Sequence, residues 1–363
     1  NYEAKLRVQI PKMDINALVG QYNSNFKADN NFTVQQRFPF PIAFSSMKIY
    51  QGELIKERAL ERDNRIWNIK RDVAIFYENW RYAFEKNQQL LKQDSVLSEL
   101  NSRVGFQVQI GETEQINAWM LNSELLLSKK QLIDVTSESK ACNEALAKRV
   151  YLNVSELDQF YFPYDVLSFN PLIDSTQLAT NPAWKGMKQS LKTLEANDRL
   201  ERHLALPDIQ LGYFNQTLVG NVPINLGVQP FTAKDRFQGG SFGISIPVLS
   251  RSNYQQSKWL QLEQERINTQ ISQAEYSWNS TYQLLLDQYF SYKEAYDAMK
   301  MNVNSLVNNV SSISSNQLKE GEIDQLDWLK LQLNIHKVKL SEIEMVHELN
   351  SIIIQLQYLS ITN

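Results

Sequence analysis

The sequence predicts an α+β membrane protein built from two tandem repeats, each with two β-strands and one long coiled-coil helical hairpin. Three observations favour this class. Two long stretches of the chain, 53–104 and 248–320, contain neither glycine nor proline. Their hydrophobic residues recur with coiled-coil spacing, and the segments before them alternate apolar and polar residues. These pieces occur twice in the same order, which indicates an internal repeat.

Composition excludes several classes of protein. The 363 residues include 37 Lys+Arg against 40 Asp+Glu, interspersed, so no basic stripe suggests a nucleic-acid partner. Cys142 is the only cysteine, which excludes an internal disulfide framework and a Cys-based zinc site. Purely apolar runs such as Ile352–Ile354 are far short of the roughly 18 residues that a spanning helix needs, so no transmembrane helix is predicted.

The first repeat covers residues 1–150. Phe32, Val34 and Phe38 alternate with polar residues, as in a strand with one apolar face. A turn containing Asn and Asp is expected near Ala28–Asn31. The predicted elements of this repeat are two strands at about 15–23 and 31–40 and a helical hairpin at about 46–150.

The second repeat covers residues 181–363 and follows a linker or equatorial segment at 151–180. Phe242, Ile244 and Ile246 alternate with small or polar residues. A long loop is expected at about 218–238. The predicted elements are a helix at 182–203, strands at about 207–217 and 238–248, and a helical hairpin at about 252–360.

The helical stretches carry a coiled-coil seam. Apolar residues alternate steps of four and three from Leu285 through Tyr289, Tyr292 and Tyr296 to Ile313, and a similar series runs from Ile69 to Phe84. We interpret the seam aromatics as core packing. Only the tail of the helix at 182–203 has a counterpart in the first repeat, at Tyr2–Val8, so we expect the natural polypeptide to continue upstream of Asn1.

Four strands with one apolar face cannot close into a barrel, and open strand edges cannot face lipid. Several chains must therefore share one barrel. Three copies would supply twelve strands, an even number within the range of outer-membrane barrels, and their helices would form a long tube.

The segments that carry a family resemblance are Asn181-Pro182, Leu206–Gln216, Asp235–Gly239 and Lys319–Leu326. With these segments the chain resembles the TolC family of outer-membrane efflux ducts, and is most similar to the CusC/CzcC-type members of Bacteroidetes heavy-metal pumps, some of which are fused to the pump. The resemblance implies a homotrimer in the outer membrane of a Gram-negative bacterium, surrounded by outer-membrane lipid, with its helical part in the periplasm. It also implies a periplasmic adaptor (membrane fusion protein) and an inner-membrane pump of the resistance-nodulation-division (RND) type as partners.

The same resemblance implies two kinds of functional residue. The tips of the two helical hairpins would contact the adaptor. A periplasmic entrance constriction would lie just after the second tip, where Asp327 matches the family's acidic ring and Lys330 replaces its second acid. The candidate tip residues are Gly111, Glu112, Thr113, Gly321, Glu322, Ile323 and Asp324. Lys330, three residues after Asp327, is placed to pair with it and weaken the ring.

No enzyme is predicted, and no cofactor or metal site. His203, His336 and His347 are far apart in the sequence, and no nucleophile with a partner base or phosphate-binding glycine loop is found. Two alternatives stay open. One is a drug or protein export duct of the same family, and the other is a soluble coiled-coil scaffold whose strands form a small capping domain.

Overall fold

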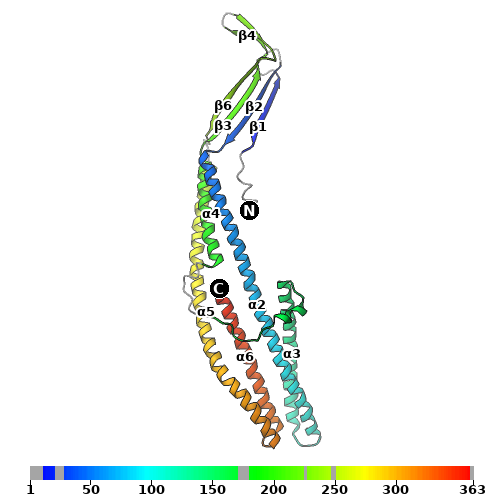
Figure 1. The fold of residues 1–363 in the computed structure, drawn as a ribbon. Coiled ribbons are helices and arrows are strands. Elements are labelled where there is room, and N and C mark those ends of the chain that lie inside the picture. The colour runs from blue at the N-terminus through cyan, green and yellow to red at the C-terminus, as the bar shows by residue number, and fades with distance from the viewer. Residues whose placement is uncertain (1–10, 21–27, 171–179, 225–226, 247–250, 360–363) are drawn as a thin grey trace. The chain divides into compact units, whose positions relative to one another are not determined.

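The computed structural model describes residues 11–20, 28–170, 180–224, 227–246 and 251–359. Helices predominate, and the strands form two small sheets (Figure 1). Parts of some predicted elements lie outside the described residues: Tyr2–Val8, strand residues 21–23 and 247–248, linker residues 171–179, and residue 360. The chain forms two compact units, each drawn from both halves of the sequence: unit 1 is Asn1–Asp63 with Pro182–Ala274, and unit 2 is Asn64–Asn181 with Glu275–Asn363.

Unit 1 contains a four-stranded antiparallel sheet. Its strands follow the order β1-β2-β3-β6. Their bounds are β1 Met13–Gly20, β2 Asp29–Phe38, β3 Asp208–Thr217 and β6 Arg236–Ser245. β2 and β3 come from distant parts of the sequence and pair directly, for example Val34 with Tyr213. The central pair therefore joins the two predicted repeats within one sheet.

The register of this sheet separates an apolar face from a polar face. Directly opposed residues share a face, so the row Ile15, Val34 and Tyr213 fixes one side. The exposed apolar residues of that side are Met13, Ile15, Val19, Phe32, Leu211, Tyr213, Phe242 and Ile244. The opposite side is mostly polar, with Asp14, Asn16, Thr33, Gln35, Arg37, Gln210, Gln216 and Ser241, and it also carries the apolar residues Leu18, Phe214 and Phe237.

Two sequence predictions about the connections are wrong. The turn expected near Ala28–Asn31 is not there, because β2 already begins at Asp29. Asp29 accepts a hydrogen bond from the Val219 N–H at 2.7 Å, and the Asn30 N–H donates to Thr217 Oγ1 at 2.9 Å. These tertiary contacts hold two turn-forming residues in a strand.

The long loop expected at about 218–238 contains a second hairpin. Strands β4 (Gly220–Ile224) and β5 (Gly227–Phe231) pair antiparallel. The Phe231 ring meets the Phe237 ring edge-on, with centroids 5.3 Å apart, which ties the hairpin to the start of β6. The glycines and prolines of this segment obscured the strand pattern in the sequence.

Helix α4 (Pro182–Leu204) lies in unit 1 together with the first part of α2 (Pro41–Gln109) and of α5 (Arg251–Glu320). It is joined to α2 by a hydrogen bond from Gln189 Nε2 to Glu53 Oε2 at 2.6 Å. It is joined to α5 by a hydrogen bond from Ser257 Oγ to Asp198 Oδ1 at 2.7 Å.

Unit 2 contains the remainders of α2 and α5, helices α3 (Gln115–Val150) and α6 (Gln325–Leu359), and a short 3₁₀ helix η1 (Val154–Phe160). α2, α3 and α6 share one hydrophobic core, made of Leu97, Leu100, Val104, Leu121, Leu125, Leu329 and Leu333. α3 ends where Tyr151 adopts a left-handed conformation. None of the described helices is both long and apolar enough to span a membrane.

The seam prediction holds only in part. Trp80, Tyr289 and Tyr296 are buried, as expected for core packing. Ile69, Tyr292 and Ile313 are exposed instead, because no described element of the chain covers them. These three residues are therefore not part of the core of a single chain.

Candidate functional site

The two hairpin tips have the same backbone geometry. Gly111 and Gly321 have φ angles of +79° and +73°. At each tip the glycine N–H donates to the carbonyl three residues back. The N–H of the next residue donates to the carbonyl five residues back: Glu112 to Gln107 and Glu322 to Gln317, both at 2.9 Å. This is the Schellman motif, in which glycine accepts the left-handed conformation that other residues resist.

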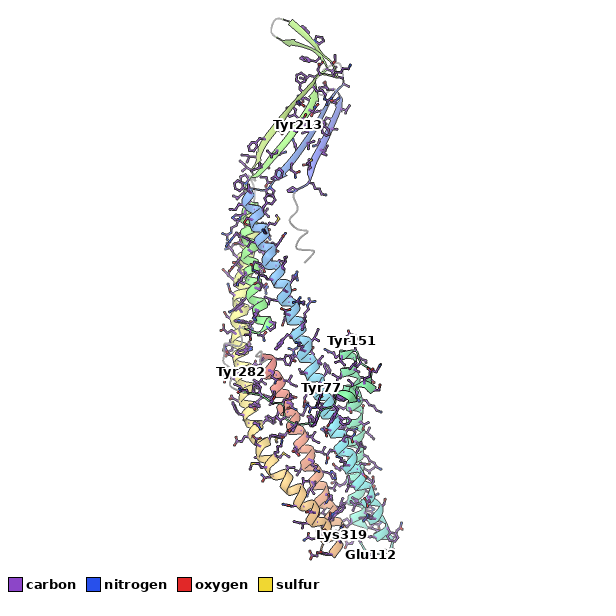
Figure 2. All side chains as sticks on the ribbon, viewed as in Figure 1. Tyr77, Glu112, Tyr151, Tyr213, Tyr282 and Lys319 are labelled. Carbon is purple, nitrogen blue, oxygen red and sulfur yellow. The ribbon has the colours of Figure 1, made fainter. Side chains whose placement is uncertain are left out.

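Both tips present acidic side chains to solvent. Glu112 and Glu322 are exposed directly after the glycines, while Thr113 and Ile323 are half-buried. Asp324 is exposed immediately before α6, and Glu114 is the exposed N-cap residue of α3. The carboxylates of Glu114 and Asp324, which directly precede α3 and α6, are stabilised by the positive ends of these helix dipoles. Figure 2 shows Glu112 and Lys319 at the hairpin ends, and neither Glu114 nor Lys319 was among the predicted site residues.

Asp327 and Lys330 form an ion pair in the first turns of α6. Lys330 Nζ donates to Asp327 Oδ1 at 3.1 Å. Both side chains are more than half exposed, at 63% for Asp327 and 61% for Lys330. An exposed pair at this helical spacing contributes only about 0.3–0.5 kcal/mol to stability. The pair nevertheless offsets the negative charge of Asp327.

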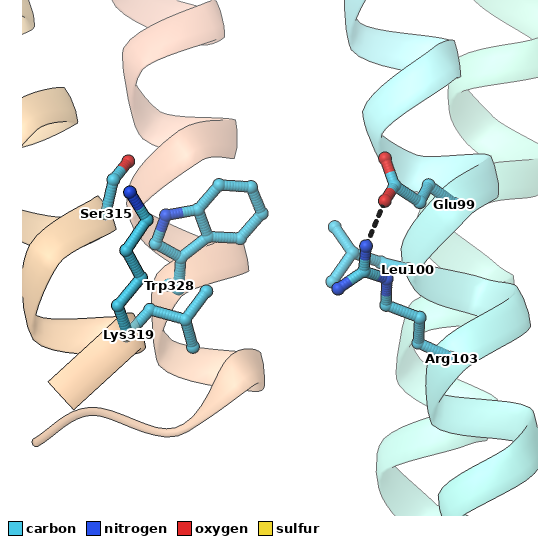
Figure 3. Close-up of a pocket in the computed structure, with 7 residues that line it drawn as sticks. Glu99, Leu100, Arg103, Ser315, Lys319 and Trp328 are labelled. Atoms are coloured by element: carbon cyan, nitrogen blue, oxygen red, sulfur yellow. Dashed lines mark hydrogen bonds and ion pairs between the residues drawn. The ribbon is translucent and has the colours of Figure 1, made fainter. Parts of the chain in front are cut away.

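Two cavities lie beside the tips within unit 2. One, of about 220 Å³, is lined by α2, α5 and α6 (Figure 3). Glu99 and Arg103 pair on one side of it, while Lys319 and Trp328 lie on the other. The second, of about 550 Å³, lies between α3 and α6. Leu121, Leu329 and Leu333 of the shared core line the second cavity, and Glu124 and Lys337 add charged groups. Such an apolar groove with charged edges suits an amphipathic helix.

The three histidines do not converge. His203 Nδ1 lies 2.6 Å from Ser46 Oγ, and His336 Nδ1 lies 2.8 Å from Gln89 Nε2. Burial, reinforced by Lys339 and Lys92, lowers the pKa of His336, so the neutral ring accepts the Gln89 hydrogen bond. Among the described residues no group of three or more His, Cys, Asp or Glu is placed to hold a metal ion.

His347 has a glutamate three residues before it, a spacing found in some metal sites. Glu344 pairs instead with Lys86 at 3.0 Å. The Nδ1 atom of His347 faces Glu78 Oε1 at 3.6 Å, and its ring stacks on Tyr82 with centroids 4.1 Å apart. The histidine is therefore packed among helices. Glu78 belongs to a buried polar network that the sequence did not predict.

No model of a known protein family matches the sequence, and no curated protein matches it. Solved structures match it along nearly its whole length. CusC, whose crystal structures concern conformational changes accompanying folding and transmembrane channel formation, has a TM-score of 0.73 at 13% identity, with 99% of this chain and 86% of CusC covered. The outer membrane protein VceC of Vibrio cholerae has a TM-score of 0.75 at 11% identity, with 99% and 89% covered. The MtrE outer membrane channel of Neisseria gonorrhoeae, in its open state, has a TM-score of 0.69 at 15% identity, with 99% and 82% covered.

The chain has the fold of these outer-membrane channels. The likeness confirms the predicted channel fold, with its helical majority and small antiparallel sheet. Within this channel fold the structure brings each tip glycine together with the acidic residues beside it, and pairs Asp327 with Lys330.

Proposed function

We propose that this protein is the outer-membrane exit duct of a tripartite efflux system. The observation that carries the proposal is the four-stranded sheet, which exposes most of its apolar side chains on one face and is mostly polar on the other. Phe242, Ile15 and Val19 are 69%, 61% and 82% exposed. Among the described residues, β1 pairs only with β2 and β6 only with β3, which leaves two strand edges open. A lipid-facing outer surface and a wet lumen account for both faces.

A homotrimer would close the open edges. The β1 edge of one copy would pair with the β6 edge of the next, and three copies would give a barrel of twelve strands. Helix α3 supports assembly independently of the sheet. Trp119, Leu126 and Ile133 follow one another at intervals of seven residues and are 63%, 62% and 70% exposed. Such a stripe is typical of a helix that packs against another helix.

The hairpin tips are the proposed contact surface for the periplasmic adaptor. Gly111, Gly321 and their acidic neighbours form two similar ends, and the groove between α3 and α6 is wide enough to receive apolar side chains of a partner helix. The adaptor would connect the duct to an inner-membrane RND pump. The duct itself would conduct passively, since the driving force would come from the pump.

The proposed cargo is heavy-metal cations, on the basis of the segments that resemble CusC/CzcC-type ducts. Asp327 is the proposed entrance constriction, with Lys330 moderating its charge. Drug or protein export is the alternative within this fold. Deleting the gene and measuring growth with metal salts and with organic drugs separates the two, because sensitivity confined to metals favours the proposed cargo.

Purification of the full chain in detergent tests the duct itself. We expect native mass spectrometry to find a trimer, and planar bilayers to show stepwise conductance after its insertion. A monomer that is extracted without detergent and gives no conductance would contradict the proposal and favour the coiled-coil scaffold.

A further inference from the structure

A segment without helix or strand, Tyr161–Asn170, lies across three helices of unit 2. We call it the strap. It follows η1 and belongs to the linker predicted from the sequence. Its hydrogen bonds reach α2, α6 and α5, so it connects helices from both hairpins. These contacts fall into two groups whose charged side chains differ in exposure.

The contacts with α2 and α6 are buried. Tyr164 donates to Glu78 Oε1 at 3.0 Å, and Arg81 donates to the Pro163 carbonyl at 2.6 Å. Asn350 of α6 accepts from the Leu167 N–H at 2.7 Å and donates to Glu78 at 3.1 Å. Glu78, Arg81 and Asn350 are only 2%, 4% and 0% exposed.

Breaking this buried end would leave charges and amides without partners in the interior. Glu78 and Arg81 lie 3.8 Å apart with side chains almost fully buried. His347 faces the same carboxylate. Removing one member of such a network is strongly destabilising, since the others stay buried and uncompensated. This end of the strap is therefore fixed to α2 and α6.

At α5 the strap presents the exposed carboxylate of Asp165 to Lys300 and to Tyr296, whose own side chain is buried. Asp165 Oδ1 accepts from Tyr296 Oη at 3.0 Å and from Lys300 Nζ at 3.3 Å. The side chains of Asp165 and Lys300 are 63% and 45% exposed. One ring contact adds to them, between Phe169 and Tyr289 with centroids 5.1 Å apart. Exposed ion pairs are weak and are screened by salt.

We propose that the strap is a latch with one fixed end on α2 and α6 and one releasable end on α5, held by Asp165. Release would free α5 around Tyr296 and Lys300 from the strap, while the strap stays on α2 and α6. In the duct proposed above, on which this last step rests, α5 would move when the channel opens. The inequality of the two ends rests on their charged groups, since Glu78 and Arg81 are buried whereas Asp165 and Lys300 are exposed.

Hydrogen–deuterium exchange of the full chain in detergent tests the latch without depending on channel activity. We expect Asp165→Asn to speed exchange of α5 amides around Tyr289–Lys300 about two- to fivefold, while the Leu167 amide stays protected. Raising the salt concentration should speed the same amides in the wild type and much less in the variant. Asp297→Asn is the matched control, because its exposed pair with Lys293 lies on α5 at 2.5 Å and does not involve the strap.

Unchanged exchange in α5 after Asp165→Asn would overturn the latch, as would equal loss of protection at Leu167. Conductance in planar bilayers provides a second measurement. If the latch opens the duct, the variant should spend more time open than wild type and the Asp297→Asn control. Absence of conductance in all three proteins would count against the proposed duct, whereas conductance with identical exchange in all three would count against the latch alone.

Discussion

At the scale of single residues, His336 links folding to pH. Its pKa lies below the ordinary value of about 6.5, because the ring is buried and Lys339 and Lys92 are near. The unfolded chain therefore binds a proton more readily than the folded chain. The stabilisation by the neutral ring is complete above about pH 6.5 and falls as the pH drops below it. The free energy of unfolding, measured with urea at several pH values, should fall less steeply toward acid pH for His336→Gln than for the wild type. An identical slope in both proteins would contradict the assignment.

The tip glycines make a second prediction at this scale. Gly321→Ala places a side chain at a φ of +73°, which should destabilise the second tip by about 1 kcal/mol. Gly105→Ala is the matched control, for which we expect the opposite change in stability. Gly105 lies inside α2 with open space around it, so alanine should stabilise the helix by about 0.5–1 kcal/mol. Hydrogen-exchange rates of the amides around each position measure the two changes in stability. Two changes in the same direction would refute the argument.

At the scale of elements, the exposed stripe of α3 predicts a contact between copies. Leu126→Asp together with Ile133→Asp should dissociate the assembly, since each apolar side chain contributes about 1.5–3 kcal/mol when buried. Gln131→Glu is the control, because it adds negative charge at an exposed position of the same helix on another side from the stripe. Native mass spectrometry should find trimers of the control only. A stable trimer of the aspartate variant would place this stripe outside the interface.

Elements were predictable where local sequence alone determines them. The absence of glycine and proline predicts the long middle part of α2 and the whole of α5, and Gly111 and Gly321 mark their ends because the Schellman motif needs a positive φ. Tertiary contacts decided the rest. Asp29 enters a strand because the Val219 N–H reaches its carboxylate from 190 residues away. No pattern near Asp29 reports that partner.

At the scale of the whole molecule, the sequence predicted the channel fold but not the network that joins its helices. Glu78 and Asn350 are separated by 272 residues, and each looks like an ordinary polar residue of a helix surface. Only the fold shows that they are buried together under the strap. The candidate tips were easier to find, because a glycine followed by glutamate recurs at both of them.

Charge at the proposed entrance gives the last prediction, which concerns the assembled duct. Asp327→Asn would leave Lys330 unpaired in every copy, so reversal potentials in planar bilayers should shift toward anions. Lys330→Gln would leave Asp327 unpaired and should shift them toward cations. The double variant removes both charges, so its reversal potential should lie close to that of the wild type. Opposite shifts that cancel are specific to a charge pair facing the ion path, because a general disturbance of α6 would move all three variants in one direction. Unchanged selectivity in both single variants would remove the constriction from the proposal and leave the duct intact.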